Sequence, residues 1–146
     1  MTGHRCACGQ GPADGDATDI RVLVVDDHEA VRTTLAELFA DEDDLTVVGQ
    51  CEDGSQVVEA VSRLHPDIVV MDLSMPVMDG LAATEALRAA HPGSRVAVLT
   101  GDGAAARAQV VAAGARALVP KGVRAEALLS CLRTVRCGCG GCPYCL

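Results

Sequence analysis

The sequence predicts an α/β domain in which five strands and five helices alternate along the chain. Short apolar segments rich in Val, Leu and Ile alternate with segments whose apolar residues recur at helical spacing. The chain has 146 residues, 49% of them hydrophobic, which is enough for one domain with a buried core. Because parallel strands are joined by right-handed crossovers, this alternation predicts a parallel sheet with helices on both faces.

Two strand and helix units precede residue 66. Strands are predicted at residues 20–25 and 45–51, where apolar residues predominate. Each strand is followed by a helical pattern, at residues 28–40 and 53–64, and a proline soon after the second pattern ends that helix. The first two units therefore have the order strand, helix, strand, helix.

The remaining units keep this order. An unbroken apolar run at residues 68–71, ended by Asp72, indicates a strand that is covered on both faces. Pro76 and the Asp79-Gly80 pair indicate a tight loop after it. The later elements are a helix at 81–91, a strand at 95–100, a helix at 104–113, a strand at 115–120 and a helix at 123–136. In such a sheet the carboxyl ends of the strands meet at one edge, where open α/β folds bind ligands.

The strand ends carry acids, a hydroxyl and an ammonium group: Asp26, Asp27, Asp72, Thr100 and Lys121. Taken singly, these residues could be a turn-capping acid, a strand-end hydroxyl and a surface charge, and Asp26 or Asp27 is also expected to cap the first helix. Three acids that meet at one edge repel each other unless a cation joins them, and all-oxygen ligands suit a hard ion such as Mg²⁺. Since the chain lacks the nucleotide motifs GxxxxGK[ST] and GxGxxG, we interpret the cluster as a phosphoryl site built from side chains.

These residues carry a family resemblance. The stretches VVDDHEAVR and DLSMPVMDG, the strand-ending Thr100 and the PKG around Lys121 resemble the receiver domain of two-component response regulators. The resemblance covers residues 20 to about 136. It implies a flavodoxin-like doubly wound sheet of five parallel strands in the order 2-1-3-4-5.

The resemblance also implies a function. Asp72 would be the phosphoacceptor and would receive a phosphoryl group from a sensor histidine kinase or a histidine phosphotransferase. Mg²⁺ would be held by Asp27, Asp72 and the Ser74 carbonyl, with Asp26 acting through water. The protein would thus be a signalling phosphoacceptor in a phosphorelay and not a metabolic enzyme. A phosphohydrolase of similar fold is disfavoured because Ser74 stands where such enzymes need an acid.

Thr100 and Lys121 would contact the phosphoryl oxygens, and movement of Thr100 would be the switch. The chain departs from the family pattern at two positions. Leu118 stands at the switch position, where the family often has an aromatic residue or His, so coupling is expected through its packing or through backbone movement. Gly122 follows Lys121 where the family often has Pro, which leaves open whether that peptide bond is cis.

Only ten residues follow Arg136, so no DNA-binding domain is expected and the receiver should act alone. It would signal by contact with an unknown downstream protein, through the face of the fourth helix, fifth strand and fifth helix. The alternative is a degenerate receiver that acts as a phosphorylation-independent interaction module or as a metal or redox sensor through its cysteine-rich tail.

Charge and composition limit the partners. The net charge is −8 and there is no Lys/Arg block, which argues against direct contact with nucleic acid. No apolar run reaches the length of a membrane span and residues 1–19 lack the apolar core of a signal peptide, so we expect no membrane contact and a cytoplasmic location. Residues 1–19 are rich in Gly, Asp and Ala and are expected to be a flexible leader.

Eight cysteines are distributed unevenly. Cys51 and Cys131 are expected to be small buried core residues. Four others crowd the tail, residues 137–146: Cys137, Cys139, Cys142 and Cys145. Their spacing, C-x-C-x2-C-x2-C, could bind Zn²⁺ or an iron-sulfur cluster, could form redox-active thiols, or could have no specific role.

Overall fold

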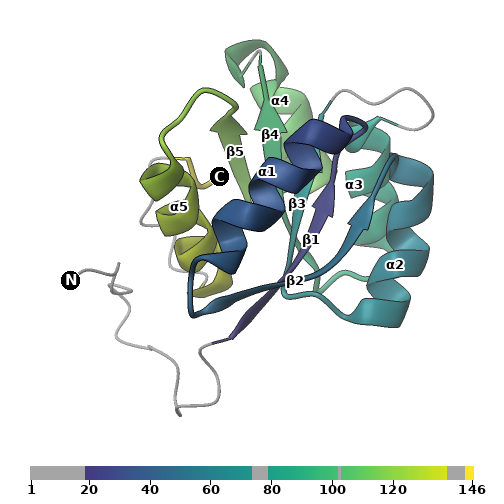
Figure 1. Cartoon of the computed structure of the whole chain (residues 1–146). Helices are drawn as coiled ribbons and strands as arrows, with labels where there is room; N and C mark the ends of the chain where they lie inside the picture. The colour runs from purple at the N-terminus through teal and green to yellow at the C-terminus, as the bar shows by residue number, and fades with distance from the viewer. Residues whose placement is uncertain (1–18, 74–78, 102, 138–143) are drawn as a thin grey trace.

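The computed structural model describes residues 19–73, 79–101, 103–137 and 144–146, and these form a five-stranded parallel sheet flanked by helices (Figure 1). The strands lie in the order β2-β1-β3-β4-β5, as predicted. Their bounds are Ile20–Val25 for β1, Leu45–Cys51 for β2, Ile68–Asp72 for β3, Arg95–Thr100 for β4 and Ala117–Pro120 for β5. The order reverses between β1 and β3, so these two strands lie side by side at the centre of the sheet.

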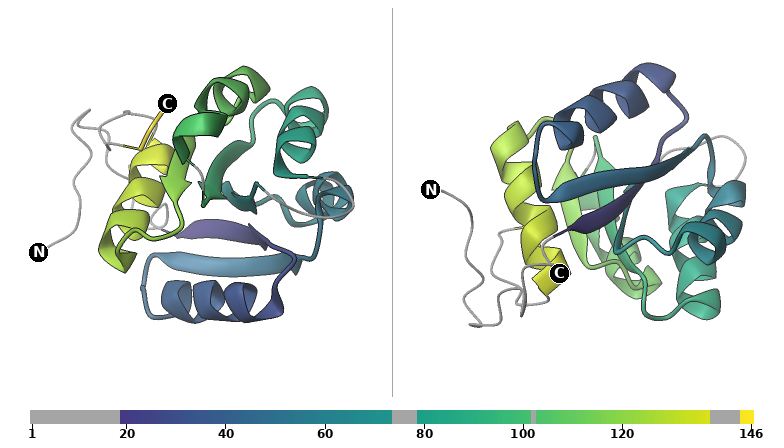
Figure 2. Two further views of the ribbon diagram at one scale, coloured as in Figure 1. Left: turned by 90° about the horizontal axis from the view of Figure 1, so that it is seen from above. Right: turned by 60° about the horizontal axis from the view of Figure 1, so that its bottom comes forward.

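Helices connect successive strands and cover both faces of the sheet (Figures 1 and 2). They are α1 (Glu29–Ala40), α2 (Val57–Leu64), α3 (Gly80–Ala90), α4 (Gly103–Ala113) and α5 (Ala125–Cys137), with a short 3-10 helix η2 (Gly54–Gln56) before α2. Helices α1 and α5 lie on one face, and α2, α3 and α4 lie on the other. No helix in the described ranges is long and apolar enough to cross a membrane.

The strands are apolar throughout because alternate residues enter two different cores. Val24 and Val70 face α1 and α5, where they pack with Phe39 and Leu132. The intervening strand residues face the other helices, as Met71 does. Cys51 and Cys131 are both buried in these cores, as predicted.

Three local predictions need correction. Neither Asp26 nor Asp27 caps α1: its N-cap is His28, which makes no side-chain capping hydrogen bond, and Asp26 Oδ1 instead accepts from the His28 backbone N–H at 2.9 Å. The second helical segment begins with a 3-10 turn, so α2 starts only at Val57. The fifth strand starts later than predicted because residues 114–116 form the turn that follows α4, in which the Ala115 N–H donates back to the Val110 carbonyl.

An ion-pair cluster ties α5 to the loop between α1 and β2. The Arg133 guanidinium donates to both carboxylate oxygens of Asp44 at 2.7 Å and to Glu42 at 2.8 Å. These side chains are half-buried. The hydrogen bond from Arg133 lowers the pKa of Asp44 despite its partial burial, and the two acids raise the pKa of Arg133. The cluster therefore joins two segments that lie about 90 residues apart in sequence.

A short segment, residues 144–146, lies antiparallel to β5 on the outer edge of the sheet. Ala117 pairs with Cys145. The Leu118 N–H donates to the Tyr144 carbonyl at 3.0 Å, and the Leu146 N–H donates to the Arg116 carbonyl at 2.9 Å. Figure 1 shows the end of the chain beside β5 and α5.

Candidate functional site

The topology brings the predicted acids together at the carboxyl edge of the sheet. Asp72 ends β3, and Asp26 follows the neighbouring strand β1. Both side chains are only 1% exposed, which is an unusual position for a carboxylate. Asp27 is partly buried beside them. Side-chain oxygens of the three acids lie within 4.8 Å of one another, as the sequence predicted for the ends of adjacent parallel strands.

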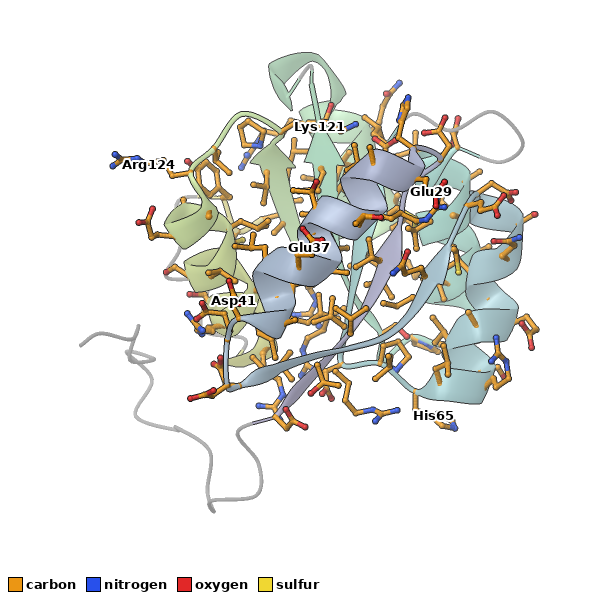
Figure 3. The ribbon with its side chains drawn as sticks, in the orientation of Figure 1. Glu29, Glu37, Asp41, His65, Lys121 and Arg124 are labelled. Atoms are coloured by element: carbon orange, nitrogen blue, oxygen red, sulfur yellow. The ribbon has the colours of Figure 1, made fainter. Side chains whose placement is uncertain are left out.

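Lys121 supplies the positive charge of the cluster. It directly follows β5. Figure 3 shows Lys121 at the edge where the strands end, and His65 at the opposite end of the molecule. Its Nζ lies 2.8 Å from Asp72 Oδ1 and 4.0 Å from Asp26 Oδ2. Burial alone would lower the pKa of Lys121, but the hydrogen bond to Asp72 and the charges of the three acids outweigh it and raise the pKa. The ammonium group is therefore held in its charged form beside Asp72.

Two carboxylate oxygens in the cluster suit a cation. Asp26 Oδ2 and Asp27 Oδ1 are buried and accept no hydrogen bond within the described part of the chain. A buried carboxylate oxygen without a donor is costly, and a hard divalent ion would satisfy both oxygens at once. The donor set of this cluster therefore fits Mg²⁺.

His28 was not predicted as a member of the site. Its Nδ1 lies at hydrogen-bonding distance, 3.2 Å, from Asp26 Oδ1. It also lies 3.1 Å from Asp27 Oδ1, in a contact that lacks hydrogen-bond geometry, although the side chain is largely exposed. Its place directly after the two acids was the available signal, because the chain must turn there to enter α1. The acidic cluster with His28 is the one group of three or more potential metal ligands found among the described residues.

Backbone contacts hold the acids in place. The Asp26 N–H donates to the Cys51 carbonyl of β2, and the Arg32 guanidinium donates to the Asp26 carbonyl at 2.6 Å. On the other side, Gly80 begins α3 so close to the end of β3 that a Cβ there would overlap the Asp72 carbonyl oxygen. Glycine at this position lets α3 start directly beside Asp72.

Of the residues predicted to take part in the switch, Thr100 lies at a strand end beside this cluster. Thr100 ends β4 beside β3 and is 3% exposed. Its carbonyl accepts the Lys121 backbone N–H at 2.8 Å, which links β4 to β5 at the site. Leu118 is buried on the α2–α4 face. The Lys121–Gly122 peptide bond, left open by the sequence, is trans.

Some predicted residues cannot be placed. Ser74, Cys139 and Cys142 lie outside the described residues, and the Cys137 side chain is not described. Cys145 pairs with Ala117 at the edge of β5. Nothing in the described ranges supports a zinc site in the tail, and the zinc site stays a prediction.

Comparisons with known proteins agree with this geometry. The family model of the response regulator receiver domain matches residues 22–133. Response regulator GacA of Pseudomonas viridiflava is 39% identical over 120 residues, which cover 82% of this chain and 56% of that protein. A protein-glutamate methylesterase/protein-glutamine glutaminase of Geobacter metallireducens is 40% identical over 105 residues, which cover 70% of this chain and 30% of that protein. The chain thus spans only about half the length of the GacA relatives.

Solved structures give the same result. The response regulator domain of Thermotoga maritima CheB superposes with a TM-score of 0.75 at 30% identity, over 81% of this chain and 96% of that one. A LuxR-family two-component response regulator from Aurantimonas sp. SI85-9A1 gives a TM-score of 0.79 at 29% identity, over 82% and 86% of the chains. Fold, acidic cluster and relatives agree, and the chain belongs to the family of response regulator receiver domains of two-component systems.

Proposed function

We propose that the chain is a phosphoacceptor in a two-component phosphorelay and that Asp72 is the residue that is phosphorylated. The observation that supports this most is the pairing of the Asp72 carboxylate with the Lys121 ammonium at 2.8 Å, beside two further acids. A carboxylate whose negative charge is maintained by a neighbouring cation remains available as a nucleophile. Its neighbours can also stabilise the charge that the phosphoryl group carries.

In the proposed reaction, an Asp72 oxygen attacks the phosphorus atom of a phosphohistidine on a kinase or phosphotransferase. The new bond joins phosphorus to the Asp72 oxygen as the bond from phosphorus to the imidazole nitrogen breaks. The electron pair of the broken bond stays on the imidazole, which takes up a proton and leaves as the neutral ring. Lys121 holds the negative phosphoryl oxygens during transfer.

Asp26, Asp27 and Asp72 would hold Mg²⁺, together with the Ser74 carbonyl that the family resemblance implies. Their buried oxygens without hydrogen-bond donors support this assignment for Asp26 and Asp27. When bound, the ion supplies positive charge that screens the repulsion between the Asp72 carboxylate and the anionic phosphoryl group.

Phosphorylation of Asp72 would change the structure of the signalling surface through β4 and β5. We assign to the Thr100 hydroxyl the hydrogen bond to a new phosphoryl oxygen, because Thr100 ends the strand next to Asp72 and is linked to Lys121. Leu118 lies on β5, three residues before Lys121. A movement of β5 would therefore change the packing of the Leu118 side chain. The downstream protein would then bind the face formed by α4, β5 and α5.

The degenerate alternative would leave a buried acidic cluster without a role. Buried charges are costly and are found mainly where they are paired or functional. The lysine placed against Asp72 therefore favours the phosphoacceptor over a phosphorylation-independent module.

Intact mass after incubation with acetyl phosphate and Mg²⁺ tests the proposal. The wild type should gain one phosphoryl group, and the gain should disappear without Mg²⁺ and in Asp72→Asn. Asp79→Asn is the matched control, because Asp79 is an exposed N-cap of α3 and asparagine caps as well as aspartate does. The proposal fails if folded wild type gains nothing, or if Asp72→Asn gains as much as Asp79→Asn.

A further inference from the structure

The outer edge of β5 offers fewer backbone hydrogen-bond donors than a regular strand edge. In the sheet order β5 is terminal, and the backbone groups that point away from β4 are those of alternate residues. Leu118 presents an N–H on this edge, whereas Pro120, the next outward position, has no N–H to offer. A partner of this edge can therefore form only a short pairing, centred on Ala117.

The 144–146 segment makes this pairing. Its two backbone hydrogen bonds join Tyr144 to Leu118 and Leu146 to Arg116, and they close the outer edge of β5. Tyr144 and Cys145 are half-buried and pack against the core on the α1 and α5 face. The segment thus covers the β5 edge next to α5, which is part of the surface assigned to the downstream protein.

The described segment is three residues long and pairs with a strand of only four residues. Leu146 is 36% exposed, so the segment buries little surface compared with the sheet itself. Short, marginal pairings of this kind open far more often than the fold unfolds. A modest change in β5 is therefore sufficient to release the segment.

The phosphoryl site is attached to the same strand. Lys121 lies three residues beyond Leu118, its N–H binds the Thr100 carbonyl, and its Nζ binds Asp72 Oδ1. If Asp72 is phosphorylated, Lys121 must transfer its contact from a carboxylate oxygen to phosphoryl oxygens that lie farther from β3. That shift acts at Lys121, directly after the end of β5 and three residues beyond the edge pairing at Leu118.

We propose that the outer edge of β5 is a strand-pairing surface that the 144–146 segment of the same chain occupies, and that phosphorylation of Asp72 displaces this segment. The coupling rests on the proposed phosphoacceptor function, whereas the pairing itself does not. Displacement would expose the Leu118 N–H and the Arg116 carbonyl to an extended segment of the downstream protein.

Amide hydrogen exchange of the full chain, read residue by residue, tests both parts. Leu146→Pro removes one donor of the pairing, and Leu146→Ala keeps it and serves as the matched control. The Leu118 amide should exchange roughly tenfold faster in Leu146→Pro than in Leu146→Ala. The Arg116 amide, which donates inward to the Val96 carbonyl, should not change.

Phosphorylation is then added to the same measurement, with intact mass confirming the phosphoryl group. The Leu118 amide of the phosphorylated wild type should exchange as fast as in Leu146→Pro. Equal Leu118 exchange in the two Leu146 variants would overturn the pairing. Unchanged Leu118 exchange in protein that has gained the phosphoryl group would overturn the coupling. If no phosphoryl group is gained, the proposed function and with it the coupling fail, and the comparison of the two variants still decides the pairing.

Discussion

Replacing Asp26 with asparagine removes one charge from a buried cluster of three acids, and we predict that the metal-free protein becomes more stable. Asp27 and Asp72 each have an oxygen within 4.8 Å of an Asp26 oxygen, and at that separation each repels Asp26 by about 3.5 kcal/mol at an effective dielectric constant near 20. Lys121 Nζ lies 4.0 Å from Asp26 Oδ2 and offsets about 4 kcal/mol of the summed repulsion of about 7 kcal/mol. Asparagine keeps the hydrogen bond that Oδ1 accepts from the His28 N–H. The expected gain in the free energy of unfolding is therefore about 1–3 kcal/mol.

The same substitution should weaken the response to Mg²⁺. A ligand that binds only the folded state at 100 times its Kd stabilises that state by about 2.7 kcal/mol. Asp26→Asn removes a charge from the proposed ion site. At the same Mg²⁺ concentration, the ion should therefore raise the free energy of unfolding of this variant much less than that of the wild type. Urea unfolding followed by far-UV circular dichroism, with and without Mg²⁺, measures both effects in a chain without tryptophan.

Asp79→Asn is again the control, because it changes the net charge equally at an exposed position. It should alter stability by less than about 0.5 kcal/mol and keep the full Mg²⁺ increment. An Asp26→Asn protein that is less stable than the wild type in metal-free buffer, or that keeps the full stabilisation by Mg²⁺, would show that Asp26 is neither repelled by its neighbours nor part of the ion site.

Three further substitutions test other contacts. Lys121→Met should slow phosphorylation by acetyl phosphate by about a hundredfold or more, measured as the rate of mass gain at Asp72. Arg133→Met should lower the free energy of unfolding by about 1–2 kcal/mol near pH 7. Because Arg133 lowers the pKa of Asp44 from 3.8, this stabilisation is present above that value and is lost as the pH falls through the lowered pKa, so the two proteins should converge in acid. Gly80→Ala should cost about 1–3 kcal/mol in urea unfolding, since a Cβ would overlap the Asp72 carbonyl.

Matched controls exist for these changes. Arg63→Met breaks an ion pair with Glu59 whose side chains are both largely exposed, and it should change stability by less than about 0.5 kcal/mol. Gly93→Ala places its Cβ in open space and should be nearly neutral. Equal effects of Arg63→Met and Arg133→Met, or of the two glycine changes, would contradict the assigned contacts. The contact assigned to Lys121 would be contradicted if Lys121→Met were phosphorylated at a rate within a few-fold of that of the wild type.

The sheet and the acidic cluster were predictable because each depends on a pattern local to one strand. Unbroken apolar runs such as residues 68–71 identified strands covered on both faces, and the parallel topology then placed Asp26 and Asp72 at one edge. Strand order was given by the family resemblance and confirmed by the structure. The positions of Thr100 and Lys121 at strand ends followed in the same way.

Features that depend on contacts between distant segments were not predictable. The cluster of Arg133 with Asp44 joins side chains 89 residues apart, and no periodicity indicates such a pair. The pairing of Cys145 with Ala117 of β5 joins backbone groups that α5 separates in the sequence, and no local pattern indicates such a pair. The N-cap of α1 was predicted wrongly because Asp26, a good capping residue by type, is held at the acidic cluster instead.

Reductive trapping identifies the residue that carries the phosphoryl group, which we propose is Asp72. Borohydride reduces an aspartyl phosphate to homoserine, and tandem mass spectrometry of the digested protein then identifies the modified position. After treatment with acetyl phosphate and Mg²⁺, we expect homoserine at residue 72. Homoserine at Asp26 or Asp27 with an unmodified Asp72 would contradict it.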